Sequence, residues 1–554
     1  MAMVMLMDMA TEMETRVRRI MIVAGVVALL GMTTQVFGQG TGFNTPSIGG
    51  GQNIPGGVSL PPAGGIPGGA DPGSTVGRSW NIVPRISLTE TLTNNVNLSS
   101  TNKQNDLITQ VAPGIHIDGR TARLNMYLDY ALIGSFYASE SDKNFSQNRL
   151  NAFGTLEAID NWMFIDFGAA ITQQLINPFG QQTPSNAFNN NVADTGTYRI
   201  SPYIRGELGG LVDYSLRYNR SFTNSGASGY SNVDLAQWLG QLRGNTRFQN
   251  LSWVIDGSQQ NTDYSNGRDY NDQRLRAMLV YRLFPQLNVM ASIGTESNNY
   301  QSLNDERQQT YGYGLDWRPT ERSQVYGFKE ERFFGNGHNV VISHRFPLSS
   351  IRYTDTRDVA FIPNQNATYG IGSLYDIYFD QFATLIPDPA ARAAYVSNLL
   401  NQAGLAPNAQ ATSDYLANRP RVQRLQQLTV TLYGSRNSIT FLAGRNNNEA
   451  LSVLPGAGGQ AIGNLSSVDQ KGYSLSFAHR LTPLTSLNLI GSRQQTESGA
   501  VSVVKTTMTT YRAGISTRFG SKTVGALYAR YSQFDSPTSP YDESALVGTI
   551  SFLF

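Results

Sequence analysis

The clearest pattern in the chain is an alternation of apolar and polar residues that recurs from Trp80 to the last residue. In the segment 311–317, YGYGLDW, large apolar side chains occupy every second position, and glycine or aspartate stands between them. A period of two predicts a β-strand with one apolar and one polar face. Because a unit of strand, turn and strand repeats along the chain, the sequence predicts an all-β protein.

Two kinds of connection alternate between the predicted strands. Short turns are expected at Asp118-Gly119, Asp160-Asn161, Gly209-Gly210, Phe284-Pro285, Pro319-Thr320, Pro347-Leu348, Thr482-Pro483 and Gly520-Ser521. Long loops rich in Asn, Gln, Ser and Gly are expected at 139–148, 173–196, 221–235, 260–272, 297–306, 446–470 and 496–506. This asymmetry is typical of membrane barrels, with tight periplasmic turns and longer outer loops. It predicts one transmembrane antiparallel β-barrel of about 22 strands, within a range of about 20–24.

One connection, 358–427, differs from the others because its apolar residues have helical spacing. These residues are Leu374, Ile377, Tyr378, Phe382 and Leu385. The pattern predicts a small helical insert at about 374–418, and strand parity places it on the extracellular side. Its apolar stripes need a surface to pack against, so it either caps or plugs the barrel mouth or binds a partner.

The first eighty residues differ from the barrel in composition. Residues 1–38 are predicted to be a signal peptide, because arginines precede a thirteen-residue apolar core at 20–32 and a cleavage site before Gln39. A membrane anchor is the alternative. Residues 39–79 are rich in Gly and Pro and are predicted to form a disordered tether, so the barrel would occupy 80–554.

The last strand ends in an apolar alternation that includes Phe552 and the terminal Phe554. This ending resembles the signal by which outer-membrane barrels are delivered to the barrel assembly machinery. Together with export and the absence of cysteine, it predicts the outer membrane of a Gram-negative bacterium. The predicted partners are outer-membrane lipid and that assembly machinery.

Composition argues against several other functions. The net charge is +2, from 42 basic and 40 acidic residues, and gives no reason to expect a nucleic-acid partner. The four histidines do not form a cluster with metal-ligand spacing, and no phosphate-binding loop or Gly-x-Ser-x-Gly motif is present. We therefore expect no enzyme activity, no metal and no cofactor.

Charged residues on the polar faces of the predicted strands are candidates for the lining of the lumen. They are Arg123, Asp129, Arg205, Glu207, Arg217, Arg274, Arg276 and Arg282. Opposite charges on neighbouring strands predict lateral pairing in a hydrated wall. Alternatively, the inward tyrosines Tyr127, Tyr137 and Tyr203 could stack on sugar rings along a glycan path.

Aromatic residues or histidines next to arginine recur at the predicted periplasmic turns, for example at 281–285, 344–347 and 479–483. Rings at the level of the lipid headgroups are typical of the interfacial girdle of a barrel. Alternatively, the arginines could form a ring that attracts an anionic solute.

The segment 317–346 resembles the central signature of a family of outer-membrane proteins found with PEP-CTERM/exosortase systems. The matching residues are Trp317, Pro319, Thr320, Arg322, Arg332, Phe333, Phe334, Gly335, His344 and Arg345. The segments 80–98 and 111–119 and the helical insert are also similar. One departure is Asn94-Asn95, where the family usually has Asp-Asn. There is also a looser likeness to general β-barrel porins.

The resemblance implies a channel or scaffold in exopolysaccharide biosynthesis or export, with polysaccharide and export-system proteins as further partners. It implies no catalytic residue. Two other functions agree with the residues. One is a general diffusion porin for small solutes, and the other is a structural barrel that anchors surface matrix at its loops.

Overall fold

The computed structural model describes residues 80–183, 189–228, 230–361, 415–417, 419–451, 467–499 and 504–554, together with Tyr378, Phe382, Val396 and Thr412. These residues form 22 β-strands and one short 3-10 helix, η1 (Ser141–Lys143). The strands are β1 (Trp80–Thr93), β2 (Asp106–Arg120), β3 (Leu124–Tyr137), β4 (Phe145–Ile159), β5 (Met163–Leu175), β6 (Val192–Leu208), β7 (Val212–Ser225), β8 (Val233–Asn245), β9 (Leu251–Tyr264), β10 (Tyr270–Phe284), β11 (Leu287–Asn298), β12 (Glu306–Thr320), β13 (Ser323–Arg332), β14 (Gly335–Arg345), β15 (Ser349–Ala360), β16 (Arg421–Tyr433), β17 (Asn437–Ala450), β18 (Ser467–Arg480), β19 (Thr485–Ser498), β20 (Lys505–Arg518), β21 (Thr523–Asp535) and β22 (Tyr541–Leu553).

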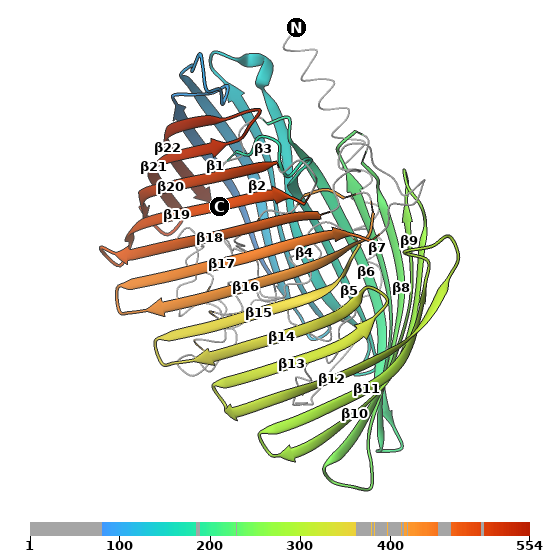
Figure 1. Ribbon diagram of the computed structural model, residues 1–554. Helices are drawn as coiled ribbons and strands as arrows, with labels where there is room; N and C mark the ends of the chain where they lie inside the picture. The colour runs from blue at the N-terminus through green and yellow to red at the C-terminus, as the bar shows by residue number, and fades with distance from the viewer. Residues whose placement is uncertain are drawn as a thin grey trace. The chain divides into compact units, whose positions relative to one another are not determined.

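The strands form one closed antiparallel sheet. Each strand pairs with the next in the chain, and β22 returns to pair with β1 from Arg85↔Leu553 to Thr93↔Ala545. Figure 1 shows the red β22 beside β1 at this seam. Closure leaves no unpaired sheet edge, as a membrane barrel requires. The prediction of a single antiparallel barrel of about 22 strands is confirmed.

The two faces of the sheet differ as the alternation predicts. On β12 the outward side chains Tyr311, Tyr313, Leu315 and Trp317 are exposed, whereas Asp316 between them is buried. Outward Leu, Ile, Phe, Tyr and Trp side chains are exposed in the same way around the sheet. An apolar exterior on a closed barrel is stable only in a bilayer, so this is an outer-membrane β-barrel. Among the described residues no helix is long and apolar enough to cross a membrane.

The two ends of the barrel differ in their connections. Short turns join the strands at one end, for example at 285–286 and 321–322, and this end corresponds to the periplasmic side. At the other end the connections are longer, although strands extend well into the predicted loops. The connection predicted at 260–272 is reduced to 265–269. One connection at this end, Phe333-Phe334, has only two residues.

Two predicted turns are displaced. Strand β12 continues through Pro319-Thr320, and its turn lies at 321–322. Strand β2 continues through Asp118-Gly119 to Arg120, and the turn lies at 121–123. Gly119 pairs with Trp80, and a Cβ at this glycine would lie 2.6 Å from the Trp80 ring. The glycine is therefore explained by the close approach of the indole and not by a turn.

Two segment predictions lie largely outside the described residues. Residues 1–79, with the predicted signal peptide and tether, are not described. The helical insert at 374–418 is described only at isolated positions, where the Phe382 N–H donates to the Tyr378 carbonyl over 3.1 Å. Both segment assignments remain predictions.

Glycines on the inward face of β12 make room for a second layer of side chains. A Cβ at Gly314 would lie 2.5 Å from the Gly327 carbonyl oxygen and 2.7 Å from Phe328 Cδ2. A Cβ at Gly312 would lie 2.7 Å from Phe328 Cζ. Phe328 is 2% exposed, so these glycines let its ring lie flat against the barrel wall.

Gly314→Ala is therefore expected to destabilise the barrel by about 1–3 kcal/mol, the usual cost of overpacking. The measurement is guanidinium unfolding in phospholipid vesicles. Gly327→Ala is the matched control, because its Cβ would meet no atom within 4 Å. Equal stability of the two variants would contradict the packing role of Gly314.

Candidate functional site on the inner wall

Most of the inner wall is lined with hydroxyl and amide groups that bond across neighbouring strands. At the seam the Ser87 and Ser551 hydroxyls lie 2.8 Å apart, and those of Thr89 and Thr549 lie 3.0 Å apart. Further round, the Ser350 hydroxyl lies 2.7 Å from that of Thr431. Such groups can also bond to water, so the face suits a hydrated lumen.

A network of ion pairs lies on the wall formed by β9–β15. Arg276 Nη2 lies 2.7 Å from Asp256 Oδ1, and Arg274 forms an ion pair with Glu330. Arg332 Nε lies 2.9 Å from Glu296 Oε2, and its Nη1 lies 2.6 Å from Asp358 Oδ1. Glu296 and Glu330 are each 1% exposed and Arg332 is 5% exposed. Buried charges of this kind are tolerated because each has a partner.

The network depends on the glycines of β12. Glu330 lies on β13 and Arg274 on β10, so their contact has to cross the two strands between them. Gly312 and Gly314 have no side chains on the inner face of β12, which leaves space for side chains to cross that strand. Arg276 also lies with its Cζ 5.5 Å from the centre of the Phe328 ring, which favours a cation–π contact.

An aromatic cluster closes this wall at the extracellular end. The short Phe333-Phe334 turn folds against Tyr300, whose ring centre lies 5.2 Å from that of Phe333. The Phe333 N–H donates to Glu296 Oε1 over 2.6 Å, and Arg332 Cζ lies 5.1 Å from the Phe334 ring centre. Gly335 has φ +91°, a conformation that favours glycine. The Arg332–Gly335 motif therefore joins the ion-pair network to the aromatic cluster.

On the periplasmic side of the ion-pair network, the inward face of the β9–β15 wall is apolar. The side chains that pack together there come from β9, β10, β11 and β13, and they are Val254, Met278, Met290, Tyr326 and Phe328. They are buried on the inward face of the barrel. This wall is therefore a packed inner layer, unlike the hydroxyl-lined seam.

The wall formed by β5–β7 carries smaller groups of charged and aromatic side chains. Arg217 Nη1 lies 2.7 Å from Asp166 Oδ2, and Arg217 Cζ lies 3.9 Å above the Tyr203 ring. Arg205 Cζ lies 4.4 Å from the Phe164 ring centre. Each guanidinium therefore lies against an aromatic face, which holds it to the wall.

The predicted lining residues fall in different places. Asp129 faces inward and accepts two hydrogen bonds from Arg85, of 2.6 and 2.8 Å. Glu207 and Arg282 are exposed near the periplasmic ends of their strands, and Arg123 lies in the turn at 121–123. The sequence did not single out Glu296, Glu330 or Asp358 as partners. Alternation alone marks these three as inward, and nothing local predicts their contacts.

The remaining motif residues lie mostly at the periplasmic rim. Trp317 faces outward and is exposed, and Pro319, Arg322 and Arg345 lie at or beside short turns. His344 Nδ1 lies 2.7 Å from the Ser323 hydroxyl, and the His344 ring contacts Phe346. Phe552 and Phe554 are exposed, and the Phe554 N–H donates to the Pro84 carbonyl over 2.9 Å. Their role in assembly remains a prediction.

Two described residues of the connection between β15 and β16 contact the inner wall. The Tyr378 hydroxyl lies 2.6 Å from Thr440 Oγ1, and the Phe382 ring packs edge-on against Tyr433 at 4.9 Å. Burial raises the pKa of Tyr378 to about 12. Both wall residues lie near the periplasmic ends of their strands, although the connection starts and finishes at the extracellular end. Tyr378 and Phe382 therefore lie against the inner wall near its periplasmic end.

The inner wall presents hydroxyl, amide and charged groups to the lumen. Among the described residues, no three His, Asp or Glu side chains form a group that could hold a metal ion. The geometry shows charged pairs and stacked guanidinium groups, which can contact a passing solute by hydrogen bonds and charge.

No family model matches the chain, and no curated protein matches it. Among solved structures, the FrpB iron transporter from Neisseria meningitidis matches 86% of this chain and 82% of its own, at 10% identity and a TM-score of 0.45. The siderophore receptor PirA from Acinetobacter baumannii matches 85% and 80%, at 7% identity and a TM-score of 0.41. The outer membrane protein opdK from Pseudomonas aeruginosa matches 86% and 99%, at 9% identity and a TM-score of 0.33. These distant similarities assign neither a family nor a solute.

Arg332→Met is expected to destabilise the barrel by about 3–5 kcal/mol, because it leaves Glu296 buried without its charged partner. Guanidinium unfolding in phospholipid vesicles measures the effect. The control is Arg220→Met, which removes a 2.6 Å pair with Asp234 from an arginine side chain that is 52% exposed. That change should cost at most about 1 kcal/mol. If both variants lose the same stability, the network is not a stabilising unit.

Proposed function

We propose that the protein is an outer-membrane channel through which small hydrophilic solutes diffuse, as in a general porin. The observation that carries the proposal is the closed sheet with a hydrogen-bonding inner face and an apolar outer face. A membrane barrel of this strand number encloses a lumen wide enough for solutes unless it is filled by the chain itself.

The charges on the inner wall support passage of solutes of either sign. Outside the β9–β15 network, Arg217 on β7 is neutralised by Asp166 on β5, and Arg85 on β1 by Asp129 on β3. Paired charges produce only short-range fields, because each carboxylate cancels its guanidinium beyond a few ångströms. We therefore expect weak preference between anions and cations.

We propose that the connection between β15 and β16 narrows the route of solutes through the lumen. The contacts of Tyr378 with Thr440 and of Phe382 with Tyr433 are the observations that support it. Because Thr440 and Tyr433 lie near the periplasmic ends of their strands, these contacts support a position of this connection inside the lumen. Of the two interpretations left open by the sequence, we therefore favour the plug over a partner-binding surface.

A role in exopolysaccharide biosynthesis or export is a second, narrower hypothesis. Its support is the resemblance of Trp317–Phe346 to the PEP-CTERM/exosortase-associated family, with polysaccharide and export proteins as partners. Glycosyltransferases and an export lipoprotein encoded beside this gene would support it. Normal polymer secretion in a deletion strain would favour the matrix-anchoring alternative, provided that matrix still binds when the lumen is blocked.

Liposomes containing the purified protein should swell in solutions of small sugars, and swelling should fall as the sugar becomes larger. Deletion of 374–418 should increase both the rate and the size limit, because the described contacts of Tyr378 and Phe382 with the wall are lost. The double variant Tyr378→Phe/Phe382→Ala should give a smaller increase in the same direction.

The control is liposomes that contain the same amount of the Trp317→Phe variant, in which the change lies on the outward face of the barrel. Its swelling should match that of the unaltered barrel. If neither the complete chain nor the deletion variant passes any sugar, the channel proposal is wrong and a structural role is favoured.

A further inference from the structure

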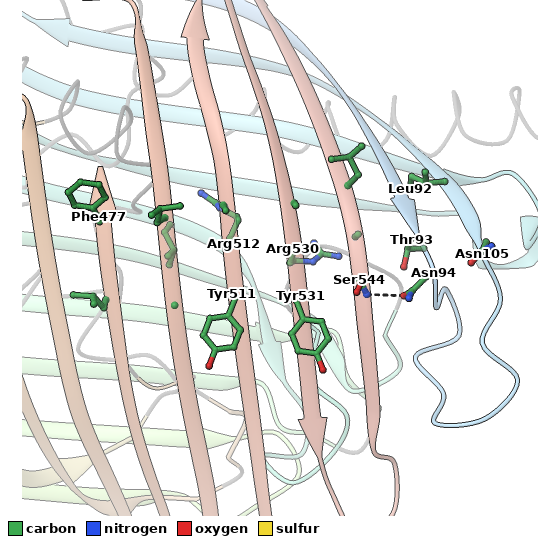
Figure 2. A pocket seen from close by; sticks show the side chains of 18 residues that line it. Leu92, Thr93, Asn94, Asn105, Phe477, Tyr511, Arg512, Arg530, Tyr531 and Ser544 are labelled. Carbon is green, nitrogen blue, oxygen red and sulfur yellow. Dashed lines mark hydrogen bonds between the residues drawn. The ribbon is translucent and has the colours of Figure 1, made fainter. Parts of the chain in front are cut away.

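A groove crosses the outward face of the barrel over β18–β22 and β1. Its volume is about 960 Å³, and its lining is mainly apolar (Figure 2). Most of its lining residues face the bilayer, because they alternate with the inward residues of the same strands. The groove is therefore distinct from the lumen.

Two adjacent rows of outward residues form the groove. Cross-strand pairing aligns the members of one row, which are Leu92, Leu546, Ala529, Ala513 and Leu489. The next row towards the extracellular side contains Ser544, Tyr531, Tyr511, Gly491 and Leu475. Small residues on three neighbouring strands, Gly491, Ala513 and Ala529, form the floor. Larger side chains border it, and Figure 2 shows Tyr511 and Tyr531 side by side.

Cationic side chains lie directly above this floor on the same outward face. Arg493 pairs across the sheet with Tyr473 and Thr509, one row above Tyr511, and it is exposed. Lys471 lies one row higher on β18, diagonally next to Arg493, a separation that long side chains can bridge.

A third cation, Arg445, stands directly opposite Lys471 in the sheet. Arg445 Nε lies 2.8 Å from Asp469 Oδ1, and Lys471 Nζ lies 3.1 Å from Asp469 Oδ2. Two cations thus share one carboxylate, which leaves one positive charge, and Arg493 adds another. The Arg445 and Lys471 side chains are 46% and 49% exposed, so they can reach a further anion.

We infer that the groove binds a phosphorylated glycolipid of the outer leaflet. An acyl chain lies along Gly491, Ala513 and Ala529, and a phosphate group contacts Arg493 and Lys471. The occupant is a lipid because this wall faces the bilayer. It is anionic because cations border the groove, since basic residues at a membrane surface attract anionic headgroups.

The position of the groove selects the leaflet. Asn94 and Asn105, which belong to the connection between β1 and β2 at the extracellular end, line one end of it. The Ser544 N–H donates to Asn94 Oδ1 over 2.8 Å and holds this edge of the groove (Figure 2). A lipid seated here therefore belongs to the extracellular leaflet, where phosphorylated glycolipids such as lipid A reside.

The test uses the complete barrel in phosphatidylcholine vesicles that contain either diphosphorylated lipid A or phosphatidylglycerol. After mild detergent extraction, native mass spectrometry counts the lipids that stay bound to each barrel. The unaltered protein should retain lipid A and little phosphatidylglycerol. Ala513→Leu/Ala529→Leu, which fills the floor, should lose the bound lipid A.

Arg493→Glu should weaken retention of lipid A by roughly one to two orders of magnitude, because it removes an attractive charge and adds a repulsive one. Ala291→Leu is the matched control, since Ala291 is an exposed outward alanine on β11, far from the groove in strand order. It should retain lipid A like the unaltered barrel, and folding of all variants is checked by guanidinium unfolding.

Three results would overturn the inference. The first is equal retention of lipid A by the unaltered barrel and by Ala513→Leu/Ala529→Leu. The second is equal retention of phosphatidylglycerol and lipid A by the unaltered barrel. The third is a mass of two barrel chains that is lost in the groove variant, which would identify the groove as a contact between copies of the chain.

Discussion

The structure depends on the absence of hydrogen-bonding partners in the lipid bilayer. Every backbone N–H and C=O group of a spanning sheet must bond within the protein, so the first and last strands have to meet. They do so in the pairing of β1 with β22, nine residue pairs from Arg85↔Leu553 to Thr93↔Ala545. Side chains reinforce this seam on the inside, where Thr93 donates to Glu543 over 2.8 Å and Arg530 also bonds to Glu543. Once the sheet is closed, alternate residues must face lipid and lumen.

Closure of the sheet does not determine which side chains fill the interior. The seam between β1 and β22 and the wall of β9–β15 differ in this respect. At the seam, serine and threonine hydroxyls bond to one another and leave a surface that water can wet. On β9–β15 a second layer of side chains covers the wall, and the glycines of β12 make room for it. Arg332 then connects the ion pairs of this layer to the aromatic cluster at the extracellular end. Substitution of a single charged residue in this network is expected to destabilise the barrel, because it leaves the buried partner charge unpaired.

Residue alternation within the strands predicts their outward face, and the alternation of short turns with long loops predicts about 22 strands in antiparallel order. All of these signals are local in the sequence. Loop lengths were overestimated because the outer ends of strands are polar on both faces. Strand β9, for example, continues through Gln259 and Asn261 to Tyr264. Gly119 was assigned to a turn because its role depends on Trp80, which is distant in sequence. The partners of Arg332 were not predictable either, since Glu296 and Asp358 lie on strands that only the folded barrel brings close.

Passage of solutes through the inside of this barrel can be tested directly, because the chain contains no cysteine. A single cysteine can be introduced at inward Ser87 or at outward Leu88, neighbours on β1 that face lumen and lipid. Single-channel current in a planar bilayer is recorded before and after a bulky, charged, water-soluble thiol reagent is added. We expect a stable current that falls after modification of Ser87→Cys and is unchanged in Leu88→Cys. No current in either barrel, or the same response in both, would contradict it.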